Sequence, residues 1–101
     1  MKRGEVWWAL VDKKRPVVLL SRDEAYAVRA MVIVAPATTT VRGYAVEVKV
    51  GRREGLPRDC VVNCDWLVTV PKADLLERAG VLSAAKCRQL DDALRFALGL
   101  E

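Results

Sequence analysis

Three runs of apolar, β-branched and aromatic residues follow one another in the first part of the sequence, each as long as one β-strand. They span residues 6–11, 16–21 and 31–37. The connection between the first two runs, residues 12–15, is short and charged, which favours an antiparallel hairpin. The next connection is long enough to hold a short helical piece through Ala25 and Ala27. An antiparallel sheet is therefore the expected framework.

The middle of the sequence extends this sheet. Residues 44–50 alternate apolar and polar side chains, as in a strand with one solvated face. Residues 51–59 contain glycines and a proline among charged side chains and are expected to form a loop. Two more short strands are predicted at residues 60–63 and 66–70, and Pro71 is expected to end the sheet.

The final third changes to a helical period. Residues 72–79 are expected to form a short helix with Gly80 as its C-cap, and Ser83 is expected to cap a longer helix. The apolar residues of that helix recur at steps of three and four: Cys87, Leu90, Ala93, Leu94, Ala97 and Leu98. A chain of 101 residues is too short for a second core, so residues 1–101 are predicted to form one domain. Its fold class is α+β, mainly β: a small curled sheet or barrel with a C-terminal helix.

Composition limits the chemistry that this chain can perform. There is no histidine, which removes the usual acid or base near neutral pH and the commonest metal ligand. Cys60, Cys64 and Cys87 lack zinc-site spacing, and the first two are expected to be small buried side chains. We therefore expect neither a metal nor another cofactor. No apolar run is long enough for a signal peptide or a membrane span, so a cytoplasmic protein is expected.

Polar residues at the expected strand ends are the candidate site. They are Arg15 before Pro16, the threonine run that begins at Thr38, and Asp65 after a short strand. Side chains at the rim of a sheet can converge on a ligand. Lys and Arg number 17 against 13 Asp and Glu, and the net charge of +4 favours an anionic partner. The sequence contains neither a glycine-rich phosphate loop nor a Gly-x-Ser-x-Gly turn.

Three segments resemble a known family in their order and spacing: residues 3–8 (RGEVWW), 14–21 (KRPVVLLS) and 34–39 (VAPATT). They are similar to the MazF/PemK toxins of bacterial toxin–antitoxin systems, also called the Kid family, and the likeness runs over nearly the whole chain. It implies an SH3-like barrel of antiparallel strands with a C-terminal helix, as in the CcdB, MazF and Kid toxins. It also implies a homodimer, metal-independent and sequence-specific cleavage of single-stranded RNA, and neutralisation by an acidic, MazE-like antitoxin.

The resemblance implies roles for three residues. Arg15 matches the arginine on which cleavage depends in the family, and Thr38 matches a threonine of its active site. Cleavage through the RNA's own 2′-hydroxyl needs donors to a phosphorane dianion, which a forked guanidinium and a hydroxyl can supply. Asp65 matches an aspartate that serves as general base in one branch, but Asn63 stands where that branch has an arginine. Asp65 as a simple turn residue is an equal alternative.

Other residues are candidates for RNA binding. Trp8 could stack on a base, although a core or dimer contact is the commoner role for such a residue. Thr39 is a reserve donor, and the remaining candidates are basic side chains that could follow a phosphate backbone or be ordinary surface charge: Arg42, Arg52, Arg53 and Arg58.

Two further functions compete with RNA cleavage. One is a non-catalytic nucleic-acid-binding module. The other is a CcdB-like gyrase poison, a class that acts through a C-terminal tryptophan. The sequence ends Leu-Gly-Leu-Glu, which counts against the second alternative.

Overall fold

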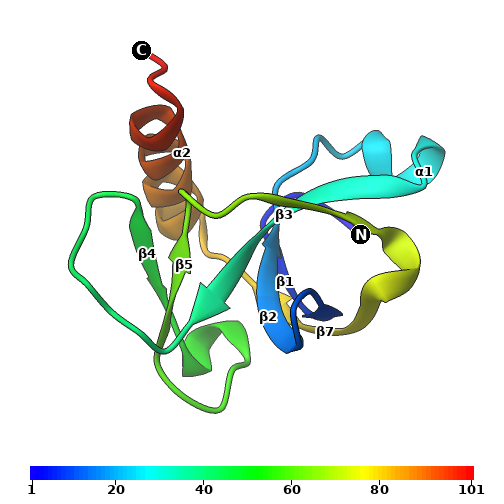
Figure 1. Ribbon diagram of the computed structural model, residues 1–101, viewed down its shortest axis with the longest axis horizontal. Helices are drawn as coiled ribbons and strands as arrows, with labels where there is room; N and C mark the ends of the chain where they lie inside the picture. The colour runs from blue at the N-terminus through cyan, green and yellow to red at the C-terminus, as the bar shows by residue number, and fades with distance from the viewer.

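The computed structural model describes residues 1–101 and consists of seven strands, two helices and two 3₁₀ turns (Figure 1). The strands are β1 (Glu5–Leu10), β2 (Lys14–Leu19), β3 (Met31–Thr38), β4 (Glu47–Val50), β5 (Cys60–Asn63), β6 (Val68–Pro71) and β7 (Leu75–Val81). The helices are α1 (Ala25–Val28) and α2 (Ala84–Leu98), and the 3₁₀ turns are η1 (Arg52–Glu54) and η2 (Lys72–Asp74). No helix has the length and apolar character that a membrane span requires.

β3 joins the two halves of the sheet. All pairs are antiparallel in the order β4-β5-β3-β2-β1-β7, and β6 pairs with the first half of β3. Only the last two residues of β3, Ala37 and Thr38, pair with β5, so the sheet curls at this point. Figure 1 shows β4, β5 and α2 on one side and β1, β2 and β7 on the other. The predicted fold class, a small curled sheet or barrel of antiparallel strands with a C-terminal helix, is confirmed: the strands form a curled antiparallel half-barrel.

Two cores lie on opposite faces of the central strands. Side chains alternate along a strand, so neighbouring residues of β2 enter different cores: Val18 packs with the β4–β5–α2 core and Val17 with the core against β6 and α1. Both valines are fully buried. Trp8 and Trp7 of β1 divide in the same way, so they point to opposite faces. The centre of the sheet is thus held from both sides.

The prediction of a helix at residues 72–79 is wrong. Only a single 3₁₀ turn forms there, and the chain then continues as β7, so Pro71 does not end the sheet. Residues from Leu75 to Val81 pair with the edge of β1, and this long-range ladder overrides the local helix propensity. Gly80 is a strand residue and not a C-cap: a Cβ there would lie 2.4 Å from the carbonyl oxygen of Glu54.

The strand predicted at residues 44–50 is shorter than expected. It begins at Glu47, because the Glu47 carboxylate accepts hydrogen bonds from the backbone N–H groups of Arg42, Gly43 and Tyr44. These donors are therefore satisfied by a side chain and not by a neighbouring strand. The last predicted strand is likewise displaced, to Val68–Pro71.

The long C-terminal helix is confirmed. The Ser83 hydroxyl caps it by accepting from the N–H of Lys86 at 3.1 Å, and Gly99 ends it in the left-handed conformation. Leu90 and Ala93 are buried against the sheet, but Leu98, expected on the same face, is exposed. The last turn of α2 extends beyond the sheet (Figure 1), so no strand lies there to cover it.

Candidate functional site

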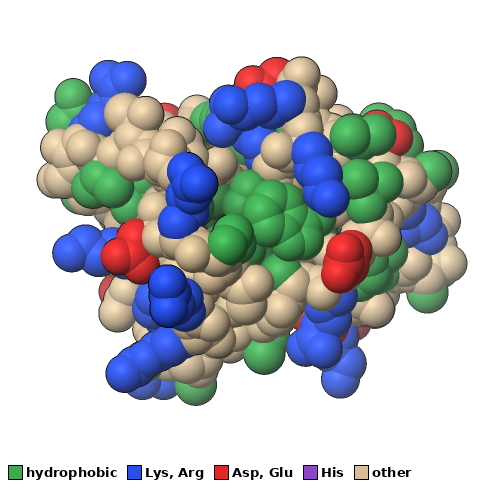
Figure 2. Space-filling model, turned by 90° about the horizontal axis from the view of Figure 1, so that it is seen from below, with side chains coloured by type: hydrophobic (Ala, Val, Ile, Leu, Met, Phe, Trp, Pro, Cys, Tyr) green, Lys and Arg blue, Asp and Glu red, His purple; other side chains and the backbone are tan.

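A groove of about 370 Å³ lies between the β1–β2 hairpin, the end of β3 and the loop before β5. It brings together five of the residues that the sequence singled out: Trp8, Arg15, Thr38, Thr39 and Arg58. Lys13 and Lys14 of the hairpin also line it, and the sequence analysis had not selected them. Figure 2 views the molecule from this side and shows an apolar patch surrounded by Lys and Arg side chains. An apolar floor with a basic rim suits an anionic ligand that has flat rings.

Arg15 is held from three directions. Its Nε and Nη2 donate to the two carboxylate oxygens of Asp12 at 2.7 and 3.0 Å, a bidentate pair. Its Nη1 makes a long hydrogen bond of 3.5 Å to the carbonyl oxygen of Ala37, and its Cζ lies 5.1 Å from the ring centroid of Trp66. The side chain is only 18% exposed. The guanidinium is therefore fixed before any ligand arrives.

The ion pair between Arg15 and Asp12 shifts the pKa of both side chains. Hydrogen bonding to Asp12 raises the pKa of Arg15, and the reciprocal bonds hold the pKa of Asp12 at about 2. A carboxylate with so low a pKa is a weak base at neutral pH. Asp12 therefore orients Arg15 and is poorly suited to accept a proton from a substrate.

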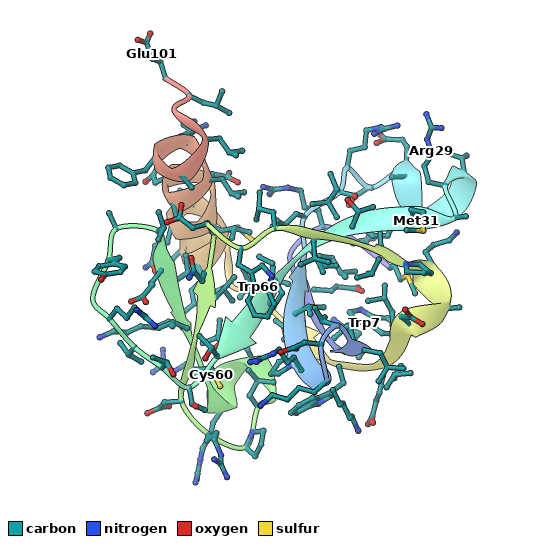
Figure 3. The ribbon with its side chains drawn as sticks, in the orientation of Figure 1. Trp7, Arg29, Met31, Cys60, Trp66 and Glu101 are labelled. Atoms are coloured by element: carbon teal, nitrogen blue, oxygen red, sulfur yellow. The ribbon has the colours of Figure 1, made fainter.

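The sequence analysis missed Asp12 and Trp66 as site residues. In the sequence, Asp12 is only one charged residue of a turn. The hairpin register could have indicated its role, because Arg15 pairs with Ala9 and so projects beside the turn that contains Asp12. No sequence pattern around Trp66 marks it as a site residue. It reaches Arg15 through the turn between β5 and β6, where its N–H donates to the carbonyl oxygen of Asn63 at 3.1 Å. Figure 3 shows Trp66 between the two halves of the sheet.

Thr38 is the last residue of β3 and lies in the groove with Arg15. Its Oγ1 accepts a hydrogen bond from the N–H of Thr40 at 3.2 Å. A hydroxyl that accepts one bond can still donate its own hydrogen. Arg15 and Thr38 therefore both present hydrogen-bond donors to the same groove.

The other predicted residues lie apart from Arg15. Asp65 is exposed outside the groove lining, in a turn where its N–H donates to the Asn63 Oδ1 at 2.9 Å, although it directly precedes Trp66. Arg42 belongs to the loop that Glu47 holds. Arg52 and Arg53 line a second cavity, next to the first.

Cys60 and Cys64 are buried, as expected, with 6% and 1% of their surface exposed, whereas Cys87 is partly exposed. Burial raises the pKa of the Cys64 thiol to about 11 and also raises that of Cys60. Both thiols therefore stay protonated at neutral pH. No three His, Cys, Asp or Glu side chains lie together where they could hold a metal ion.

Replacing Asp12 by Asn should lower the free energy of unfolding near neutral pH but leave it unchanged near pH 2. The folded pKa of about 2 lies below the ordinary value of 3.8, so the pair stabilises the fold above about pH 4. That contribution disappears as the pH falls through about 2. Urea denaturation of both proteins between pH 2 and 7 measures the difference.

Asp92→Asn is the matched control, because it breaks another Asp–Arg pair three residues apart, with 3.2 Å between Arg95 Nη1 and Asp92 Oδ1. A difference between wild type and Asp12→Asn that is equal at pH 2 and pH 7 would contradict the role of the ion pair.

Comparison with known proteins agrees with this architecture. Residues 2–98 match the family model described as PemK-like, MazF-like toxin of type II toxin-antitoxin system. The chain is 41% identical over 99 residues to the probable endoribonuclease MazF5 of Mycobacterium tuberculosis, a match that covers 95% of this chain and 91% of the relative. It is 42% identical over 93 residues to endoribonuclease MazF3 of the same organism, covering 92% and 90% of the two chains.

Solved structures show the same fold. The Mycobacterium tuberculosis toxin MazF-mt6 superposes with a TM-score of 0.92 at 40% identity, covering 96% of this chain and 98% of that one. A mycobacterial endoribonuclease in complex with its cognate antitoxin gives a TM-score of 0.89 at 28% identity, covering 100% and 97%. With its sequence and its whole architecture in agreement, the chain belongs to the PemK-like, MazF-like toxins of type II toxin–antitoxin systems.

Proposed function

We propose that this chain is an endoribonuclease toxin that cuts single-stranded RNA at specific short sequences without a metal ion. The RNA's own 2′-hydroxyl loses its proton to a general base and attacks the adjacent phosphate, and the 5′-oxygen leaves and takes a proton from water. The products carry a 2′,3′-cyclic phosphate and a 5′-hydroxyl. The observation that supports this most directly is the guanidinium of Arg15, fixed in a basic groove beside Thr38.

Arg15 has donors to spare for the transition state. Asp12 and the Ala37 carbonyl engage three of its N–H groups, and a guanidinium has five, so two remain. Two parallel N–H groups match two oxygens of a phosphorane dianion, whose charge exceeds that of the starting diester. Because the pKa of Arg15 is raised, its role is charge stabilisation and not proton donation.

We assign Thr38 as a further donor to the phosphorane and Thr39 as a secondary one. Asp65 is our candidate for the general base that takes the 2′-hydroxyl proton. It lies outside the groove lining but directly precedes Trp66, whose ring lies against Arg15. Asp12 is assigned as a positioning residue, because its low pKa makes it a weak base.

The walls of the groove supply RNA contacts. Lys13, Lys14 and Arg58 form no ion pair with any acidic side chain, so their charges are free for phosphates. Trp8 offers a ring for base stacking, with the Nζ of Lys14 5.5 Å from its centroid. We assign Arg42, Arg52 and Arg53 to more distant parts of the same strand.

We further propose that residues 1–101 act as one toxin domain in the cytoplasm, as a homodimer held in check by an acidic, MazE-like antitoxin. The family of the chain and the antitoxin complex of a 28% identical relative support the partner. The exposed apolar side chains at the end of α2, Phe96 and Leu98, are typical of a surface that a second protein covers.

RNA incubated with the purified protein in EDTA should be cut, and mapping of the fragment ends should find 2′,3′-cyclic phosphates and 5′-hydroxyls. Strict dependence on magnesium, or 5′-phosphate ends, would contradict the mechanism. Tight binding of RNA with no cleavage would favour the non-catalytic alternative.

A further inference from the structure

A second cavity, of about 520 Å³, adjoins the groove. Cys60 lines both, and the loop before β5 forms a wall of each, with Arg58 facing the groove and Asp59 the cavity. Its volume lies within the range of about 300–1,000 Å³ that is typical of small-ligand pockets. Figure 3 shows Cys60 at the lower end of the β4–β5 half, where the two hollows meet.

We propose that this second cavity binds a nucleotide of the same RNA strand that lies in the groove. Its base lies against the exposed side chain of Val41, and its phosphate binds Arg52 and Arg53. This inference rests on the proposed function and adds to it a subsite remote from the scissile phosphate.

The loop that carries the two arginines is fixed from within. The carboxylate of Glu54, which is only 3% exposed, accepts from the N–H of Gly51 at 2.8 Å. The N–H of Leu56 donates to the carbonyl oxygen of Gly51 at 3.1 Å. The cavity wall is therefore built in advance, which lowers the ordering cost of binding a ligand.

The charge of the cavity is positive. The buried carboxylate of Glu54 is neutralised by Lys86, whose Nζ lies 3.4 Å from Glu54 Oε1. Asp59 is the one other acidic residue in the lining, against three cations that form no ion pair: Lys49, Arg52 and Arg53. An anionic ligand is therefore favoured.

The position of the cavity beside the groove favours RNA as that ligand. The basic residues run from Lys14 and Arg15 past Arg58 to Arg52 and Arg53, so a strand that leaves the groove across the loop before β5 reaches the cavity. A basic track lined with apolar surface is the common arrangement for single strands that extend over several nucleotides.

The test compares the double variant Arg52→Ala/Arg53→Ala with the wild type on RNAs of two lengths. The cleavage sequence is first mapped with the wild type. A short RNA then covers only that sequence, and a long one extends on both sides, each with a 2′-deoxy sugar at the cut site to prevent cleavage. Arg88→Ala/Arg95→Ala, on the exposed face of α2, removes the same charge and is the matched control.

The Arg52/Arg53 variant should bind the long RNA several-fold more weakly, with a slope of log affinity against log salt that is smaller by about 0.7 for the one lost phosphate contact. It should bind the short RNA with the affinity of the wild type. The control variant should bind both RNAs with the affinity of the wild type. Three results would overturn the subsite: an equal loss of affinity for both RNAs, no loss of affinity for either RNA, or weaker binding of an acidic antitoxin peptide alone. The proposed function itself fails only if the wild type does not cut RNA in EDTA, so the two failures are distinguishable.

Discussion

Arg15→Ala should reduce the rate of RNA cleavage by about a hundredfold to a thousandfold, which corresponds to about 3 to 4 kcal/mol of transition-state stabilisation. In the proposed mechanism, the two free N–H groups of the guanidinium face charge that increases as the phosphorane forms, so their loss should raise the barrier more than it weakens substrate binding. Single-turnover cleavage of a mapped RNA, with protein in excess, measures this rate separately from product release.

Two further variants show what the arginine contributes. Arg15→Lys keeps the charge but loses the planar fork, and it should recover only a small part of the rate. Arg95→Ala removes an exposed arginine from α2 and should cut like the wild type. Thermal unfolding of Arg15→Ala checks that the fold persists. Near wild-type cutting by that variant would place the site elsewhere.

Gly55→Ala should destabilise the protein by about 2 to 5 kcal/mol. Gly55 has a φ of +84°, where a side chain is strained, and its Cβ would lie 2.0 Å from the carbonyl oxygen of Ala79 in β7. Because the obstacle is backbone within a strand, it cannot rotate away, and either the loop or β7 must shift. Urea denaturation measures the change in the free energy of unfolding.

Gly43→Ala is the matched control for this effect. Gly43 has nearly the same φ, +77°, but nothing lies within 4 Å of the position of its Cβ. Its substitution should cost only the conformational strain, about 1 kcal/mol. If the two variants lose the same stability, the close approach of the loop to β7 does not contribute.

Local patterns were sufficient for most of the sheet. The hairpin, β3 and β5 each bury an apolar run that is visible in the sequence, so their local preference and their tertiary environment agree. β7 could not be found this way. Leu75 to Val81 is a good helical segment, and only the edge of β1, some seventy residues earlier in the chain, makes it a strand.

The candidate site likewise contains residues that the sequence marks and residues that only the fold reveals. Arg15 and Thr38 could be named from the sequence because strand ends and the family resemblance both mark them. The contact with Trp66 could not, since it depends on how the turn after Asn63 crosses the sheet. The sequence left open whether the basic residues follow a phosphate backbone or are ordinary surface charge, and only the fold shows that Arg58 lines the groove and that Arg52 and Arg53 line the neighbouring cavity.

β2 sends Val17 into one core and Val18 into the other, and Arg15 lies on the same strand two residues earlier. Any substitution that repacks either core therefore pushes on the backbone that aims the guanidinium. With Arg15 in its proposed role, a change in the interior of this toxin should therefore also affect its chemistry. The hairpin turn and the loop before β5 are different, because residues such as Lys13 and Pro57 contact the groove from outside both cores. Those two segments are where the chain can acquire a new RNA target while its cutting machinery stays in place.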